Sequence, residues 1–409
     1  MSVIIQKYGG TSVGTIERIR SVAERIQRTR EKGHQVVVVV SAMAGETDRL
    51  LRLAHDLSPR PDARELDMLL NTGEMVSIAL VAMALQDAGC RAESFTGTQG
   101  GIVTDNVHTR ARIKQVVTTR LRKALEAGII PVVAGFQGVS EAEEFTTLGR
   151  GGSDLTAVAL ASALEAEVCE IYTDVDGVYS ADPRLVPQAR LLERVSYDEM
   201  LELARLGAKV LQARSVLFAK KYNVPVVVKS SFTEGGGTLI TKPDQDMEQV
   251  VVAGVALDKN QAKITLTRLP DRPGIAGKLF GHIAATGMVV DMIIQNASEG
   301  GLTDISFTIP RPDAPQALEL ARHLLPELGA EDATLQSDIA KVSIVGVGMQ
   351  SHSGVAARMF QALAADNINI LMISTSEIKV SCVIQDRYAE LALRVLHDEF
   401  QLAPGAAVC

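Results

Sequence analysis

The sequence has few of the features that mark disulfide scaffolds, metal sites and proteins that bind charged polymers. Its four cysteines, Cys90, Cys169, Cys382 and Cys409, are scattered without a Cys-x-x-Cys spacing. We therefore expect reduced thiols and neither a disulfide framework nor a zinc site. The seven histidines show no metal-ligand spacing, and the formal net charge of −8 argues against nucleic-acid or anionic-membrane partners.

Long hydrophobic runs are also missing. The chain opens directly on an apolar strand pattern, without a charged leader and an apolar signal core. The most apolar expected helix, residues 75–85, is far shorter than a membrane span and is expected to be buried. We therefore expect a cytoplasmic protein with no membrane partner. A chain of 409 residues should form two or three domains.

The N-terminal part of the chain alternates buried strands with helices, which predicts an α/β fold with a mostly parallel sheet between helical layers. Ligands bind beyond the carboxyl ends of such strands, where Lys7, Ser41, Gly135 and Asp174 fall. The expected strands, besides the opening one, are 36–40, 129–134, 168–173 and 224–229. The expected helices are 16–32, 63–88, 110–127, 155–165 and 197–222.

The C-terminal part repeats itself. Residues 273–280 parallel 353–360, and 288–293 parallel 368–373, so each copy is expected to form a ferredoxin-like βαββαβ unit. The second copy lacks its last strand, and residues 250–256, ahead of the first copy, are a spare one. We infer that the first unit is inserted within the second. The expected domains are 1–247, then 263–337, and finally 250–261 together with 340–409.

The segment from Lys7 to Ser12, Lys-Tyr-Gly-Gly-Thr-Ser, predicts a phosphate cradle. Gly9 and Gly10 let backbone N–H groups approach an anion, and Lys7 adds a full positive charge. Thr11 and Ser12 are expected to cap the helix that follows. The spacing is neither that of a P-loop nor that of a dinucleotide-binding turn. The alternative is an ordinary strand–turn–helix junction with a surface lysine.

Two further segments suit an amino-acid substrate. Arg150, in Gly149–Asp154, offers a planar fork for a carboxylate at a helix start, and Asp154 either caps that helix or orients Lys7. Glu74, at the start of the apolar helix, either complements the helix dipole or binds an ammonium group. Ser41 and Thr47, on the loop after the second strand, are further hydrogen-bonding candidates.

Residues 173–177, Thr-Asp-Val-Asp-Gly, form an expected turn at a strand end. Its carboxylates are able to hold the waters of Mg²⁺ or ribose hydroxyls, although most Asp-Gly pairs only make turns. Lys209 and Lys229-Ser230 add positive or polar groups, but a single lysine is more often a solvated surface residue.

Taken together, these segments resemble the aspartate kinase family of the amino-acid kinase superfamily, over essentially the whole chain. The resemblance is greatest to the bacterial type that lysine and threonine inhibit jointly, and the paired C-terminal units are similar to ACT domains. The matching segments are 7–12, 40–43, 73–74, 134–136, 149–154, 173–177 and 181–184.

The resemblance implies ATP- and Mg²⁺-dependent phosphorylation of the side-chain carboxylate of L-aspartate, the first step of the lysine, threonine and methionine pathway. It implies catalytic roles for Lys7, Lys209 and Asp154, with Gly9 and Gly10 donating N–H groups. The residues implied for aspartate are Ser41, Thr47, Glu74, Arg150, Gly151, Gly152 and Ser153. Besides Lys7, Gly9 and Gly10, the residues implied for ATP are Thr173, Asp174, Tyr179, Asp182, Arg184, Lys229 and Ser230.

The resemblance also implies feedback inhibition by lysine plus threonine and a homo-oligomer formed through the ACT domains. An internal start near Met247 would give an α2β2 assembly, although an ordinary linker methionine is the simpler interpretation. Ser353 and Ala356 depart from the expected pattern, which points to one altered effector pocket. The implied effector residues are Asp271, Gly274, Ile275, Ala276, Asp291, Gln295, Asn296, Thr303, Asn369, Ile370, Ser376 and Glu377.

Three alternatives stay open from the sequence. One is a related kinase for glutamate, acetylglutamate or a nucleotide monophosphate. A dehydrogenase with ACT sensors would need a Gly-x-Gly-x-x-Gly turn, which is absent. The third is a non-catalytic amino-acid sensor, against which the intact Lys7, Arg150, Asp154 and Asp174 argue.

Overall fold

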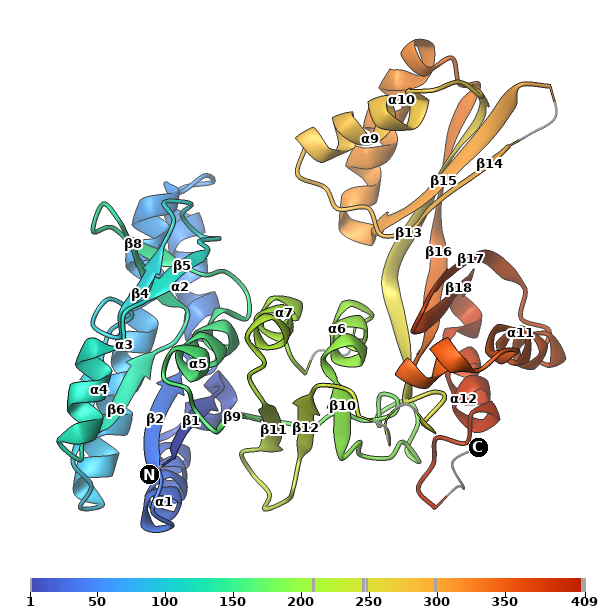
Figure 1. Ribbon diagram of the computed structural model, residues 1–409. Coiled ribbons are helices and arrows are strands. Elements are labelled where there is room, and N and C mark those ends of the chain that lie inside the picture. The colour runs from blue at the N-terminus through green and yellow to red at the C-terminus, as the bar shows by residue number, and fades with distance from the viewer. Residues whose placement is uncertain (1, 208–209, 245–246, 248, 298–299, 406–409) are drawn as a thin grey trace. The chain divides into compact units, whose positions relative to one another are not determined.

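The chain folds into two compact units, shown in Figure 1. The computed structural model describes residues 2–207, 210–244, 247, 249–297 and 300–405. The first unit comprises Met1–Tyr179 and Leu191–Glu248, and the second comprises Ser180–Arg190 and Gln249–Cys409. A short excursion of the chain, Ser180–Arg190, thus leaves the first unit, belongs to the second, and returns.

The first unit is built on an eight-stranded sheet with the order β10-β12-β11-β9-β1-β2-β6-β3, in which only the β11–β12 pair is antiparallel. The strands are β1 (Val3–Tyr8), β2 (Gln35–Val40), β3 (Ala92–Phe95), β6 (Ile130–Ala134), β9 (Val168–Thr173), β10 (Arg194–Ser196), β11 (Val226–Ser230) and β12 (Thr238–Thr241). The helices are α1 (Ile16–Glu31), α2 (Glu46–Leu57), α3 (Ala63–Asp87), α4 (Thr119–Glu126), α5 (Gly152–Ala163), α6 (Tyr197–Arg205) and α7 (Ala213–Tyr222).

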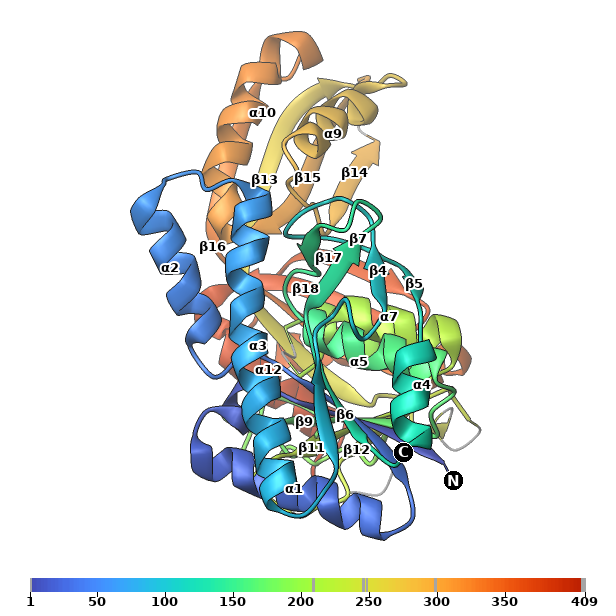
Figure 2. The same ribbon diagram turned by 90° about the vertical axis from the view of Figure 1, so that its left-hand side faces the viewer.

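Both faces of the central strands are covered, which explains their unbroken runs of β-branched residues. In β2, Val36, Val38 and Val40 pack into one apolar cluster with α1 and α3, while Val37 and Val39 point to the other face and are equally buried. Figure 2 shows α3 on one side of the strands and α5 and α7 on the other. The predicted α/β class with a mostly parallel sheet is confirmed.

A second, four-stranded sheet in the first unit was not predicted. It has the order β5-β4-β7-β8, with β4 (Ile102–Thr104), β5 (Ile113–Val116), β7 (Gln137–Ser140) and β8 (Phe145–Thr147). The expected helix 110–127 is wrong in its first half, because that stretch forms β5 before α4. The expected helix 197–222 is also wrong, because the chain turns at Gly207, which has a φ of 102°, and divides it into α6 and α7.

Two helix starts also differ from expectation. The cap of α1 is Thr15, whose hydroxyl accepts from the Arg18 N–H at 3.3 Å. Thr11 and Ser12 instead lie in a separate 3₁₀ helix, η1 (Gly10–Val13), because Gly14 separates it from α1. The expected helix 63–88 is confirmed as α3, and the apolar stretch 75–85 is the C-terminal part of this helix of 25 residues.

By length and composition alone, α3 could cross a membrane, and it is the one such helix among the described residues. Half of its apolar stretch is buried inside the protein. It also buries Asp67, Asn71 and Glu74. These properties are those of a core helix.

The second unit contains one antiparallel six-stranded sheet with the order β14-β15-β13-β16-β18-β17. The strands are β13 (Gly254–Pro270), β14 (Ile293–Ala297), β15 (Leu302–Pro310), β16 (Asp332–Val345), β17 (Ile370–Ser376) and β18 (Lys379–Gln385). The helices are α9 (Ile275–Ala285), α10 (Ala314–Leu328), α11 (Val355–Ala365) and α12 (Ala389–Glu399), with 3₁₀ helices η2 (Arg311–Asp313), η3 (Val347–Ser351) and η4 (Asp386–Tyr388).

Two βαββαβ modules share the long strands β13 and β16. The C-terminal half of β13 pairs with β15 and with the first half of β16, and β14 and α9–α10 complete the first module. The N-terminal part of β13, residues 254–258, pairs with residues 341–345 of β16, which also pair with β18. The chain ahead of the first module therefore supplies the edge strand of the second, as an insertion of one module within the other requires.

Candidate active site

The carboxyl ends of four neighbouring strands continue their hydrogen bonding into the loops that follow. The Gly9 N–H donates to the Tyr172 carbonyl at 3.1 Å, and the Ser41 N–H donates to the Tyr8 carbonyl at 3.1 Å. The Gly135 N–H donates to the Val40 carbonyl at 2.9 Å. The loops after β1, β2, β6 and β9 are thereby held at one edge of the sheet.

The glycine turn after β1 is shaped by close backbone approach. A Cβ on Gly10 would lie 2.7 Å from the Ala42 carbonyl oxygen, so no other residue fits without moving the backbone. The Gly10 carbonyl accepts from the Ala44 N–H at 3.1 Å, which fixes the loop after β2 against the turn. A Cβ on Gly9 would lie 3.7 Å from the Lys7 ammonium, so that ammonium lies above the turn.

Lys7 forms a buried ion pair with Asp154, with 2.6 Å between Nζ and Oδ1. The two residues are only 8% and 7% exposed. That Asp154 oxygen has no hydrogen bond of normal geometry among the described residues, so the contact is an electrostatic one. The pair joins β1 to the first turn of α5 and holds the ammonium at the glycine turn.

The start of α5 is packed too closely for side chains at its glycines. Gly151 has a φ of 70°, and a Cβ there would lie 1.8 Å from Gln212 Cγ. A Cβ on Gly135 would lie 2.7 Å from Ser153 Oγ, which brings the end of β6 against α5. A Cβ on Gly152 would lie 2.9 Å from Phe136 Cδ2. Arg150 precedes this turn and is exposed to solvent.

Glu74 is a buried carboxylate with a free acceptor. It lies in the middle of α3, not at a helix start as expected, because the helix continues through Gly73. Its Oε1 accepts from the Ala42 N–H at 3.2 Å, whereas its buried Oε2 has no partner among the described residues. Burial raises the pKa of Glu74 to about 7. The Glu74 carboxylate is therefore suited to bind a cationic group.

The predicted hydroxyl residues Ser41 and Thr47 lie close in sequence to Ala42, whose N–H donates to Glu74. Ser41 directly follows β2 and is half-buried. Thr47 lies in the first turn of α2, not on a loop as expected, because the helix begins at Glu46 after the left-handed Gly45. Ser41 directly precedes Ala42 in the sequence, and Thr47 follows it by five positions.

The turn after β9 carries an exposed carboxylate. Asp174 is exposed and accepts from the Thr173 hydroxyl at 3.0 Å. The neighbouring Asp176 is already used, because it accepts from the Thr233 hydroxyl at 2.6 Å and from the half-buried Tyr179 hydroxyl at 3.2 Å. Ser230, at the end of β11, is buried and caps the loop after it.

Lys229 is not brought together with Lys7. It pairs in register with Tyr172, which pairs with Tyr8, and paired residues share a face of the sheet. Since side chains alternate along a strand, Lys229 points to the face opposite Lys7. Its ammonium is 2.6 Å from Glu170 Oε1 on that face.

Two more predicted residues lie elsewhere. Asp182 and Arg184 belong to the excursion Ser180–Arg190 of the second unit, where the guanidinium and the Arg184 N–H donate to the Asp182 carboxylate. That pairing lowers the pKa of Asp182. Lys209 lies outside the described residues.

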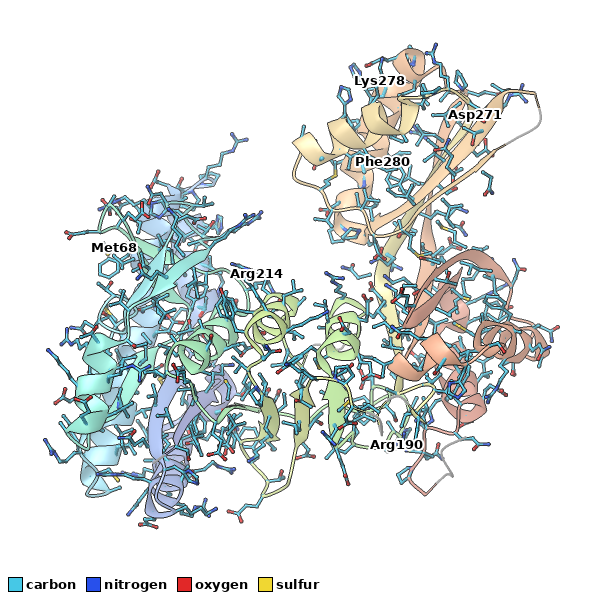
Figure 3. The ribbon with its side chains drawn as sticks, viewed as in Figure 1. Met68, Arg190, Arg214, Asp271, Lys278 and Phe280 are labelled. Carbon is cyan, nitrogen blue, oxygen red and sulfur yellow. The ribbon has the colours of Figure 1, made fainter. Side chains whose placement is uncertain are left out.

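Two supporting residues are not predicted from the sequence. Asp67 is fully buried and accepts from the Thr109 N–H and the Thr147 hydroxyl, which fixes the strand leading to Arg150. Arg214, labelled on α7 in Figure 3, donates to the Leu148 carbonyl at 2.6 Å. The one signal in the sequence is that Asp67, a charged residue, occupies a position of α3 where the helical pattern predicts a buried apolar side chain.

The predicted effector residues lie on the first and second modules of the second unit. Gly274 is the left-handed N-cap of α9, and Asp271 precedes it in the loop after β13 (Figure 3). Asp291 forms an ion pair with Lys341, which is almost fully buried. Glu377, in the turn between β17 and β18, accepts from the Gln350 amide at 3.3 Å. The others are on or beside these elements: Ile275, Ala276, Gln295, Asn296, Thr303, Asn369, Ile370 and Ser376.

Comparison with known proteins identifies the family. A family model described as the amino acid kinase family matches residues 2–230, and an ACT domain model matches residues 267–323 and 342–400. The aspartokinase of Pseudomonas aeruginosa is 56% identical over 404 residues, which cover 98% of each chain. The chain belongs to the aspartokinase family. The aspartokinase of Corynebacterium glutamicum is 51% identical over 407 residues, 98% of this chain and 97% of that one.

Solved aspartokinase structures agree with this family and fold. Escherichia coli aspartokinase III in complex with aspartate and ADP superposes with a TM-score of 0.80 at 26% identity, covering 98% of this chain and 100% of that chain. The same enzyme in complex with lysine and aspartate gives a TM-score of 0.77, covering 97% and 99%. The predicted resemblance to aspartate kinases, with an amino-acid kinase fold and ACT domains, is confirmed.

Proposed function

We propose that the site around Lys7 and Asp154 transfers the γ-phosphoryl group of ATP to the side-chain carboxylate of L-aspartate, giving 4-phospho-L-aspartate and ADP. The observation that carries this proposal is the buried ion pair at the glycine turn, which fixes an ammonium group where backbone N–H groups are also close. Family membership supports the reaction, because the closely related chains are aspartokinases.

The reaction needs alignment and charge stabilisation more than proton transfer. The attacking carboxylate is already ionised at neutral pH, so no general base is required. One of its oxygens attacks the γ-phosphorus, and the bond to the ADP oxygen breaks. Lys7 stabilises the charge on the transferring group, and Gly9 and Gly10 line its path. Asp154 is a positioning residue that holds the Lys7 ammonium.

Aspartate recognition follows from two opposite charges. The free Oε2 of Glu74 is suited to the substrate ammonium, which would satisfy a buried acceptor. Arg150, at the N-terminus of α5, is suited to a substrate carboxylate, and Ser153 in the first turn adds a hydroxyl. Ser41 and Thr47 are further hydrogen-bonding candidates around the same loop.

The nucleotide is proposed to lie along the turn after β9, near Thr173, Asp174 and Tyr179. Among the described residues no three His, Cys, Asp or Glu side chains cluster as a metal site. Mg²⁺ commonly binds through one or two carboxylates plus nucleotide phosphates, and the exposed carboxylate of Asp174 fits that mode. When bound, the ion would neutralise phosphate charge.

Feedback inhibition by lysine and threonine is proposed for the second unit. Its two modules each present a left-handed glycine at a helix start, Gly274 and Gly354, which exposes backbone N–H groups suited to an amino-acid carboxylate. A homo-oligomer is proposed as well, since β14 is an edge strand and the nearby Val289 and Ile293 are 70% and 53% exposed. An internally initiated chain from near Met247, and a cytoplasmic location, remain predictions.

The decisive experiment measures ATP- and Mg²⁺-dependent hydroxamate formation with aspartate, with glutamate and without an amino acid. We expect hydroxamate in the reaction that contains aspartate and in neither of the other two. Hydroxamate only in the reaction that contains glutamate would assign a different substrate. Lys7→Ala should lower kcat about 100- to 1,000-fold, as loss of a charge-stabilising group does. Aspartate binding, measured by calorimetry, should change little. Lys220→Ala, which removes an exposed ion pair with Asp198, is the matched control.

A further inference from the structure

Two oxygens on α3 are buried acceptors without a hydrogen-bond partner in the part of the chain that the structure describes. They are Asn71 Oδ1 and Glu74 Oε2, and the two residues are only 1% and 3% exposed. Asn71 and Glu74 are three positions apart on the helix, so their side chains lie on the same face. An unpaired buried acceptor costs free energy, so two neighbouring ones in one unit call for a common partner.

The Asn71 amide has a defined orientation. Its Nδ2 donates to the Asp67 carbonyl, one turn earlier, at 2.6 Å. A flipped amide would place its oxygen against that carbonyl oxygen, so Oδ1 is the free atom. The main-chain carbonyl of Asn71 accepts from the Gln137 amide at 2.7 Å. Burial raises the pKa of Glu74, and a side-chain interaction with the same Gln137 opposes part of that rise. Gln137 therefore lies beside both residues.

A group that only donates hydrogen bonds fits these two oxygens better than a water molecule does. A water would donate a proton to each oxygen, but its own acceptor sites would then need donors. The Ala42 N–H already donates to Glu74 Oε1, and the Gln137 amide to the Asn71 carbonyl. A primary ammonium group has three N–H donors and no acceptor, and the Glu74 carboxylate balances its charge.

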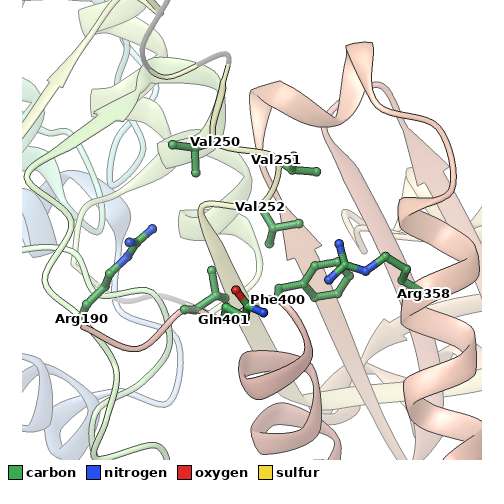
Figure 4. Close-up of a pocket in the computed structure, with 8 residues that line it drawn as sticks. Arg190, Val250, Val251, Val252, Arg358, Phe400 and Gln401 are labelled. Atoms are coloured by element: carbon green, nitrogen blue, oxygen red, sulfur yellow. The ribbon is translucent and has the colours of Figure 1, made fainter. Parts of the chain in front are cut away.

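A small cavity in the second unit, shown in Figure 4, has the opposite chemistry. It encloses about 20 Å³, which is room for about one water molecule. Arg190 contributes a guanidinium group and Gln401 an amide, so its lining includes N–H donors. Such a lining suits a water or an anion, whereas the free atoms of Asn71 and Glu74 are acceptors and suit a cation.

We propose that Asn71 is a second ligand of the substrate ammonium group, beside Glu74, and thereby determines specificity for a free amine. This inference rests on the proposed function, which assigns that ammonium to Glu74. The Glu74 carboxylate supplies the charge, and Asn71 Oδ1 accepts a second N–H. An N-acylated amino acid has one N–H and no positive charge, so it leaves one oxygen unpaired and is rejected. Because both oxygens are buried, binding requires a local opening at the loop after β2, whose Ala42 contacts Glu74.

The test replaces Asn71 with leucine, which has a similar shape and no acceptor. We expect Asn71→Leu to raise the KM for aspartate about tenfold, the effect of one lost hydrogen bond to a charged group, with kcat and the KM for ATP unchanged. The melting temperature without substrate should be unchanged or higher, because an unpaired acceptor is removed. Ser77→Ala is the matched control and should leave every kinetic constant unchanged. Ser77 is also fully buried on α3, and its hydroxyl donates to the Gly73 carbonyl at 3.5 Å.

Succinate, which is aspartate without its ammonium group, distinguishes a lost ligand from a distorted site. As a competitive inhibitor it should bind Asn71→Leu as well as it binds the wild type. Asn71→Ser and Asn71→Ala form a second pair that differs by one acceptor oxygen, and the serine variant should have the lower KM for aspartate.

An unchanged KM for aspartate in Asn71→Leu would overturn the proposal, and so would an equal loss of affinity for succinate. Glu74→Gln separates the two levels of the argument. If Glu74→Gln leaves the KM for aspartate unchanged at alkaline pH, the assignment of the ammonium to Glu74 fails. If it raises that KM while Asn71→Leu does not, only the role of Asn71 fails.

Discussion

Replacing Glu74 with glutamine should remove a pH dependence that burial imposes on the first unit. Burial raises the pKa of Glu74 from 4.5 to about 7 in the folded protein. A carboxyl whose pKa is raised on folding favours the folded state at low pH, and this contribution is lost as the pH rises through about 7. Glutamine keeps the oxygen that accepts from Ala42 and does not titrate.

The magnitude follows from the size of the shift. At about 1.4 kcal/mol per pKa unit, the wild-type protein should lose about 2 kcal/mol of unfolding free energy between about pH 5.5 and about pH 8.5, relative to Glu74→Gln. Aspartate binding should respond in the opposite direction, because only the ionised carboxylate pairs with an ammonium. Its ionised fraction rises about tenfold between about pH 6 and about pH 8, so the KM for aspartate should fall by a similar factor.

Chemical denaturation at several pH values measures the first effect, and initial rates at saturating ATP measure the second. In Glu74→Gln the KM for aspartate should be nearly independent of pH. At alkaline pH it should be higher than the KM of the wild type. If the stabilities of the two proteins change in parallel across this range, the burial argument is refuted. If the variant shows the same pH dependence of KM as the wild type, the role of Glu74 in ammonium binding is refuted.

Other substitutions test the packing. Gly10→Ala should lower kcat and destabilise the protein by about 1 to 3 kcal/mol, because the added Cβ meets the Ala42 carbonyl at 2.7 Å; thermal unfolding and turnover check this. The matched control Gly277→Ala, in a helix with nothing near the added Cβ, should instead stabilise by about 0.5 to 1 kcal/mol. Asp291→Asn should destabilise the second unit by about 3 kcal/mol, because Lys341 stays buried without its carboxylate; the partial exposure of Asp291 places this at the low end for buried pairs, and an unchanged melting curve would contradict it.

The sequence by itself determined the main layers and the edge that carries the site. Runs such as the five valines of β2 have no polar alternation, so they predict strands covered on both faces, and parallel strands place their carboxyl ends together. The adjacent glycines after Lys7 indicated a close backbone approach, which the structure shows between Gly10 and Ala42. The repeat in the C-terminal part likewise predicted two similar modules, because similar patterns bury similar faces.

Only the tertiary structure decided the environment of individual side chains. Local patterns did not show that β5 belongs to a second sheet, because β5 is a short edge strand with no buried residue, so its pairing with β4 does not appear in the hydrophobic periodicity. Nor did they show that Lys229 faces Glu170, which depends on strand register. The pKa of Glu74 and the attachment of Ser180 to His397 depend on burial and on contacts between residues far apart in sequence. Such properties arise when the elements pack, because desolvation and hydrogen-bond geometry are set by neighbours that the local sequence does not specify.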